Sequence, residues 1–124
     1  MNFLIIDDDK IFADKLITIL KKEFTNSFCY FSEYLSMNIL SEKSYYAIFC
    51  DIILKENNGI SIAKQIKEKY PKTPIIFISN HNDLIFETQY IQPLCFIRKS
   101  KLKEDFNLFK TLIAEKFKSD GDIQ

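Results

Sequence analysis

The chain has 124 residues, which is enough for one compact domain but too few for an enzyme with a separate cofactor domain. Hydrophobic residues make up 47% and charged residues 27%, so a disordered segment is excluded. The 17 basic and 17 acidic residues cancel, and this balance gives no sign of a surface for nucleic acid or anionic membrane.

In chain order, short and continuously apolar runs predict strands over 3–6, 28–31, 47–50, 75–78 and 94–97. Apolar residues at helical spacing predict helices over 11–24, 62–70 and 102–117. The segments 32–43 and 82–91 are less periodic, and we expect helices there because parallel strands require crossovers.

This alternation predicts an α/β fold: a doubly wound, five-stranded parallel sheet of flavodoxin-like type, with strand order 2-1-3-4-5 and helices on both faces. We expect residues 1–118 to form the domain and residues 119–124 to begin a linker or a disordered tail.

No apolar run approaches the roughly 20 residues that cross a bilayer. The N-terminus lacks the basic region and the cleavage site of a signal peptide, so we expect a cytoplasmic protein without a membrane partner. The three cysteines lie in apolar stretches without CxxC spacing, and we interpret Cys29, Cys50 and Cys95 as buried small hydrophobic residues.

Chemically active residues follow the predicted strands, at the edge where such sheets bind ligands. Asp7, Asp8 and Asp9 follow the first strand, Asp51 the third, Ser79 the fourth and Lys99 the fifth. At about 4 Å and an effective dielectric near 20, each pair of carboxylates repels by roughly 4 kcal/mol, so a cation is needed. Oxygen ligands without a nearby His or Cys favour Mg²⁺, and a carboxylate beside Mg²⁺ and a lysine is able to act as a nucleophile toward phosphorus.

These residues, together with the Asn58-Gly59 turn and the run from Phe96 to Lys99, resemble the receiver domain of two-component response regulators over essentially the whole chain. The stretch from Ile75 to Lys99, with Gln92-Pro93-Leu94 before the last strand, looks most like the receivers of LytTR regulators.

The resemblance implies a signalling phosphoacceptor and not a turnover enzyme. By resemblance, Asp51 accepts the phosphoryl group from a histidine kinase, Asp8 binds Mg²⁺ directly, and Asp7 binds it directly or through water. The resemblance also implies that the backbone carbonyl of Ile53 is a metal ligand and that Lys99 contacts a phosphoryl oxygen. It implies that Ser79 and Phe96 are the switch pair. It further implies that Ile53 and His81 tune dephosphorylation. Asp9 matches no ligand position and is expected to place negative charge at a helix N-terminus.

The resemblance also implies partners. Activation is expected to favour a homodimer through the fourth helix, fifth strand and fifth helix. Transcription is expected to be regulated through an output domain that this chain does not contain, and a stand-alone receiver is the open alternative. Any DNA contact would belong to that output domain.

Three residues depart from the family pattern: Ser100 replaces the usual proline, Asn80 a small residue and Lys55 a common proline. Asn80 and Ser100 leave open a degenerate receiver that acts only as a docking module.

Asp7 and Asp9 have the spacing of a small Asp-dependent phosphohydrolase, but that function leaves Asp51 without a role. A flavin-binding protein is disfavoured, because the first loop is acidic and has no Gly, Ser or Thr to hold a phosphate. His81 has no metal-binding partner in the sequence, so a plain surface histidine is the simpler interpretation.

Overall fold

A computed structural model of the chain describes residues 1–34, 36–54, 58–80 and 91–122. Its five strands pair in parallel in the order β2-β1-β3-β4-β5, which confirms the predicted flavodoxin-like sheet. The strands are β1 (Asn2–Ile6), β2 (Phe28–Ser32), β3 (Ala47–Asp51), β4 (Ile75–Ser79) and β5 (Cys95–Arg98). Each strand begins and ends within one residue of its predicted run, because polar residues or prolines bound the apolar runs.

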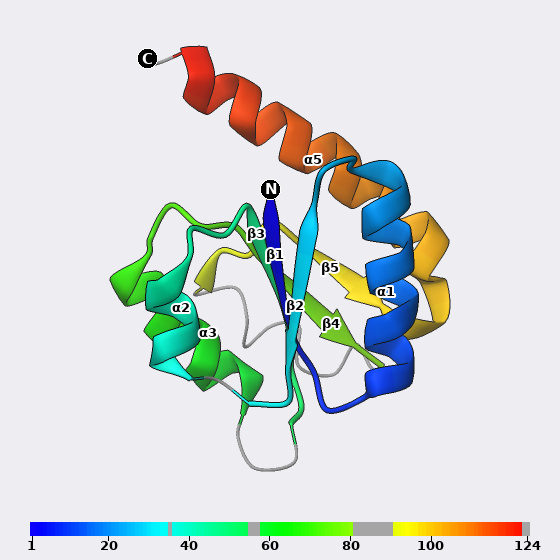
Figure 1. Cartoon of the computed structure of the whole chain (residues 1–124), viewed down its shortest axis with the longest axis vertical. Coiled ribbons are helices and arrows are strands. Elements are labelled where there is room, and N and C mark those ends of the chain that lie inside the picture. Colours follow the sequence, from blue (N-terminus) through cyan, green and yellow to red (C-terminus); the bar gives the residue numbers. More distant parts are fainter. Residues whose placement is uncertain (35, 55–57, 81–90, 123–124) are drawn as a thin grey trace.

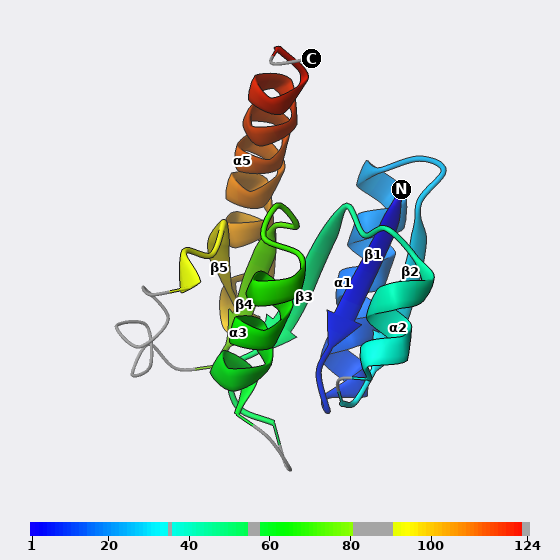
Figure 2. The same ribbon diagram turned by 90° about the vertical axis from the view of Figure 1, so that its left-hand side faces the viewer.

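The helices cover both faces of the sheet (Figures 1 and 2). One face carries α1 (Lys10–Glu23) and α5 (Leu102–Asp122), and the other carries α2 (Met37–Glu42) and α3 (Gly59–Lys69). A short 3₁₀ helix, η2 (Lys99–Lys101), joins β5 to α5. None of the helices within the described ranges is long and apolar enough to cross a bilayer.

Two sequence-based boundaries differ from the structure. The helix expected over 32–43 is only six residues long, since β2 continues to Ser32 and α2 begins at Met37. The last helix continues to Asp122, so the segment 119–122 is helical although a linker or disordered tail was expected from residue 119. The helix expected over 82–91 falls, up to residue 90, outside the described residues.

Side-chain caps start the two helices that flank the sheet edge. Asp9 precedes α1, and one of its carboxylate oxygens accepts a hydrogen bond from the backbone N–H of Phe12 at 3.0 Å. Asn58 does the same for α3 by accepting from the N–H of Ile60 at 2.8 Å. The two caps thus fix the starts of α1, after β1, and of α3, after β3.

Two separate cores fill the space between the sheet and its helices. The core under α1 and α5 is rich in phenylalanine, and the core under α2 and α3 is mainly aliphatic. Phe117 stacks on Tyr46 with ring centroids 4.2 Å apart, which anchors the carboxyl half of α5 near the start of β3. Cys50 and Cys95 are buried as predicted, whereas Cys29 is only half-buried because it lies on the edge strand β2.

Gly59 lets α3 approach the end of β3. Its N–H donates to the carbonyl of Ile52 at 2.8 Å, and a Cβ built on Gly59 would lie 1.8 Å from the backbone oxygen of Asp51. Any side chain at this position must push the strand end and the helix start apart. The Asn58-Gly59 pair therefore determines where the carboxyl end of β3 lies.

We expect Gly59→Ala to lower the free energy of unfolding by about 2 kcal/mol or more, because the backbone contact leaves no room for a methyl group. Urea unfolding followed by circular dichroism measures this change. Ser61→Ala, at an exposed position of the same helix, is the control and should change stability little. A Gly59→Ala protein as stable as the wild type would contradict the close approach.

Candidate functional site

Three carboxylates meet at the carboxyl edge of the sheet. Asp7 and Asp8 follow β1, and Asp51 is the last residue of the neighbouring strand β3. One oxygen from each lies within 4.8 Å of the others. Asp7 is 0% and Asp51 6% exposed, whereas Asp8 is half-buried. The sequence-based expectation that these side chains meet at one edge is therefore met in space.

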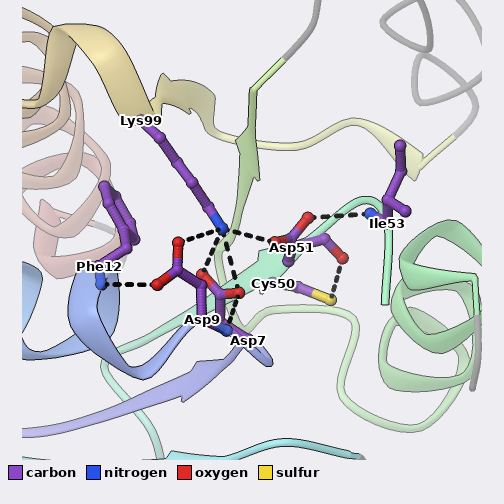
Figure 3. A network of polar contacts seen from close by, with 7 residues as sticks. All are labelled: Asp7, Asp9, Phe12, Cys50, Asp51, Ile53 and Lys99. Carbon is purple, nitrogen blue, oxygen red and sulfur yellow. Dashed lines mark hydrogen bonds and ion pairs between the residues drawn. The ribbon is translucent and has the colours of Figure 1, made fainter. Parts of the chain in front are cut away.

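The ammonium group of Lys99 lies among Asp7, Asp9 and Asp51 (Figure 3). Its Nζ is 2.9 Å from Oδ2 of Asp51, 3.2 Å from Oδ2 of Asp7 and 3.4 Å from Oδ2 of Asp9. The side chain is only 10% exposed, and its Nζ lies 5.3 Å from the ring centroid of Phe12. One buried cation thus bridges acids that follow two different strands.

Burial makes the charged form of Asp7 costly. Burial, together with a hydrogen bond to Asp51, raises the pKa of Asp7 to about 7. Burial alone would lower the pKa of Lys99, but the hydrogen bond to Asp51 and the charges of Asp51 and Asp7 raise it. The ammonium is therefore held charged by its partners.

The donor set fits a hard divalent cation. Oδ1 of Asp7 accepts hydrogen bonds from the N–H of Asp9 and from Lys99, whereas the buried Oδ2 makes an ion-pair contact with Nζ of Lys99 at 3.2 Å and no hydrogen bond of good geometry in the described part of the chain. Together with the oxygens of Asp8 and Asp51, this buried oxygen gives the all-oxygen environment that Mg²⁺ prefers. An ion placed there would coordinate an oxygen whose contact within the described residues is the ion pair with Lys99.

The carboxylate of Asp51 is held in a fixed orientation. Oδ1 accepts a hydrogen bond from the backbone N–H of Ile53 at 2.9 Å, and Oδ2 faces Lys99 (Figure 3). A pocket of about 350 Å³ opens over this group, and its lining consists of Asp8, Asp9, Asp51, Ile53, Ser79, Asn80 and Lys99. The pocket gives a small anionic reactant access to the carboxylate.

The other predicted site residues differ in how close they lie to the carboxylate of Asp51. Ser79 ends β4 and lines the pocket, as does Asn80. Phe96 lies on β5, where it is half-buried and stacks on Phe77 with ring centroids 5.9 Å apart. Ile53 contacts Asp51 through its backbone, while 59% of the residue surface is exposed. His81 lies outside the described residues.

Sequence reasoning missed two features of this region. Asp9 was expected only to supply charge at a helix start, but it both caps α1 and contacts Lys99. Arg98 was not singled out, yet its guanidinium forms a two-pronged ion pair with Asp105. Neither contact has a local sequence signal, because each depends on how the chain turns after β5. The peptide bonds within the described residues are all trans, including that between Lys99 and Ser100.

Comparison with known proteins identifies what this architecture is similar to. Residues 3–96 match the response regulator receiver domain family. A putative response regulator, NtrX-like, from Rickettsia bellii is 34% identical over 86 residues, which are 68% of this chain but only 18% of that protein. The chain therefore spans less than a fifth of the length of this relative.

Solved structures show the same fold. The crystal structure of NtrX from Brucella abortus superimposes with a TM-score of 0.81 at 19% identity, covering 97% of this chain and 28% of that one. The response regulator TrrA from Thermotoga maritima, solved in complex with Mg²⁺ and BeF, gives a TM-score of 0.78 at 17% identity, covering 90% of this chain and 97% of that one. These relatives give no support to the expected LytTR subfamily.

We expect the stability of the metal-free protein to fall as pH rises from about 4 through 7, because Asp7 has a pKa of about 7 in the folded chain and an ordinary one of 3.8 when unfolded. The folded state then binds more protons than the unfolded state across this window. Asp7→Asn should remove that part of the pH dependence and raise the unfolding free energy at pH 8 by on the order of 1–3 kcal/mol.

Urea unfolding in EDTA at pH 5 and pH 8 measures both effects. Asp14→Asn, at an exposed position of α1, is the matched control for the loss of one carboxylate. An Asp7→Asn protein that keeps the wild-type pH dependence would show that Asp7 is ordinary in its ionisation.

Proposed function

Because this chain belongs to the response regulator receiver domain family of two-component systems, we propose that it accepts a phosphoryl group from a histidine kinase on Asp51, with Mg²⁺ as cofactor. One observation carries the assignment of the acceptor. Asp51 is the acid that at once contacts Lys99, belongs to the carboxylate cluster and lines the pocket. We propose residues 1–118 as the receiver domain.

The proposed reaction is an in-line transfer between two nucleophiles. Oδ2 of Asp51 forms the new P–O bond with its lone pair, while the P–N bond to the kinase histidine breaks and its electron pair stays on the imidazole nitrogen, which takes up a proton from solvent water. The N–H of Ile53 holds the other carboxylate oxygen during the attack. Lys99 then transfers its hydrogen bond from Asp51 to a phosphoryl oxygen and keeps the added charge neutralised.

We assign the Mg²⁺ ligands to Asp7, Asp8, Asp51 and the backbone carbonyl of Ile53. When bound, the ion supplies charge neutralisation for the acids and the incoming phosphoryl oxygens. The buried Oδ2 of Asp7, which pairs with Lys99 but makes no hydrogen bond of good geometry to any described residue, supports this assignment. So does the similar Thermotoga protein, whose structure contains Mg²⁺ and BeF.

The proposed output is a change of partner surface. Ser79 and Phe96 are the switch residues in this proposal: the hydroxyl moves toward the phosphoryl group, and the aromatic ring on β5 then turns inward. A homodimer that uses β5 and α5 is the expected active form, and exposed Leu108 on α5 is available to it. We further propose that the domain works in the cytoplasm and controls transcription through a separate DNA-binding output domain, as part of a longer protein.

Two alternatives fit the site less well. A phosphohydrolase built on Asp7 and Asp9 needs Asp9 free for proton transfer, but Asp9 caps α1 and contacts Lys99. A docking module without phosphoryl chemistry needs no Lys99 held among acids. We therefore propose a phosphoacceptor and not a turnover enzyme. Membership of the LytTR subfamily stays a prediction.

Incubation with acetyl phosphate and Mg²⁺ should add the mass of one phosphoryl group to the intact protein. Asp51→Asn should abolish the adduct, because the amide nitrogen is not a nucleophile toward phosphorus. EDTA should abolish it as well. Asp14→Asn, the exposed control, should be modified like the wild type, and an adduct that persists in Asp51→Asn would refute the acceptor assignment.

The lifetime of the phosphorylated form should depend on Ile53, which lines the pocket next to Asp51. We expect Ile53→Asn to shorten that lifetime roughly threefold or more, because an amide admits and orients the attacking water where the aliphatic side chain excludes it. Loss of the mass adduct with time after removal of acetyl phosphate measures this. Ile11→Asn changes another exposed isoleucine that lies outside the pocket lining, and should leave the lifetime unchanged. Equal lifetimes for Ile53→Asn and the wild type would exclude this role.

A further inference from the structure

Arg98 and Asp105 form the best-defined ion pair near the site. The backbone N–H and the Nε of Arg98 both donate to Oδ2 of Asp105 at 2.9 Å, and its second terminal nitrogen donates to Oδ1 at 2.9 Å. Asp105 therefore binds the backbone and the side chain of the same residue. We call this three-bond contact the Arg98–Asp105 clamp.

The clamp spans the segment that carries Lys99. Arg98 is the last residue of β5 and is registered opposite Ser79 on β4, and Lys99 begins η2 immediately afterwards. Asp105 lies in the first turn of α5. The clamp thus ties the end of the strand to the start of the helix and closes the turn of Lys99–Lys101 between them.

This turn has to be held by something other than proline. The residue after Lys99 is Ser100, which fixes no backbone angle as a proline would. A lysine side chain is long and flexible, so its ammonium stays among three acids only if its Cα is fixed. The cap residue of η2 is Arg98, whose side chain makes no capping bond and instead binds Asp105, so the clamp restrains the turn from outside alongside the packing of Leu102 on the core.

We propose that the Arg98–Asp105 clamp is a positioning device that fixes the backbone of Lys99 and thereby places its ammonium at Asp51. This inference rests on the proposed function and deepens it, since it names residues that set the phosphorylation rate without touching the phosphoryl group. The clamp acts through Lys99 alone.

The chemistry of the clamp suits this task. Charge-assisted bonds with the two-pronged geometry of arginine are stronger and more directional than a lysine pair. Asp105 is only 13% exposed, and its hydrogen bonds to Arg98 lower the pKa of its carboxyl, so it stays ionised at neutral pH. Its place in the first turn of α5 adds a favourable interaction with the helix dipole.

The first test measures the rate of phosphoryl uptake from acetyl phosphate in Asp105→Asn and Arg98→Lys. Both should lower the maximal rate roughly three- to tenfold with little change in the half-saturating concentration, since the group that stabilises the transition state is misplaced. Glu23→Gln is the matched control, because it removes a different ion pair of α5, to Lys110, that lies outside the pocket lining. Unchanged rates in Asp105→Asn would overturn the proposal.

The second test separates positioning from a general loss of structure. In a Lys99→Met background, adding Asp105→Asn should slow uptake no further, because the clamp has no ammonium left to place. A purely structural role predicts that Asp105→Asn slows uptake by the same factor in both backgrounds, and that result would overturn the inference.

A third measurement does not depend on phosphoryl transfer. The ¹⁵N signal of the Lys99 ammonium, assigned by its loss in Lys99→Met, should be sharp in the wild type and broadened or lost in Asp105→Asn. If the wild type takes up no phosphoryl group, the proposed function fails while this signal still tests the clamp. A sharp, unshifted signal in Asp105→Asn would refute the clamp and leave the proposed function standing.

Discussion

The structure depends on the balance between buried carboxylates and one ammonium group. Asp7 and Asp51 are almost fully buried beside each other, and two such charges in a low-dielectric site repel strongly. Lys99 offsets this repulsion by contacting both, and its own desolvation is offset in turn by these contacts. The site thus holds more negative charge than the protein itself neutralises, which favours a divalent cation there.

The sheet and its two cores hold these charged side chains at one place. Parallel strands place the ends of β1, β3, β4 and β5 at one edge, and the two cores fix the helices against the sheet so that this edge does not spread. Gly59 and the Asn58 cap fix the backbone path between β3 and α3, and the Asp9 cap fixes the backbone path between β1 and α1. The same residues that start helices therefore also hold the loops of the site.

The strands and the meeting of the acids could be predicted because both follow from short-range patterns. Apolar runs identified the strands, and the rule that parallel strands share a carboxyl edge brought Asp7, Asp8 and Asp51 together. The length of α2 and the contact of Asp9 with Lys99 could not be predicted in this way. They depend on where a strand stops and on how a turn directs a side chain, and neither has a repeating pattern in the sequence.

The contact between Asp7 and Lys99 joins residues 92 positions apart. Such a contact exists only when the first and the last strand both belong to the sheet. Bringing them together lowers the conformational entropy of the chain, and the ion pair offsets part of that free-energy cost. The ion pairs of Lys99 with Asp7 and Asp51 therefore belong to the completed sheet and not to any part of it. A chain that ended before residue 99 would keep Asp7 and Asp51 side by side without the ammonium group that offsets their repulsion.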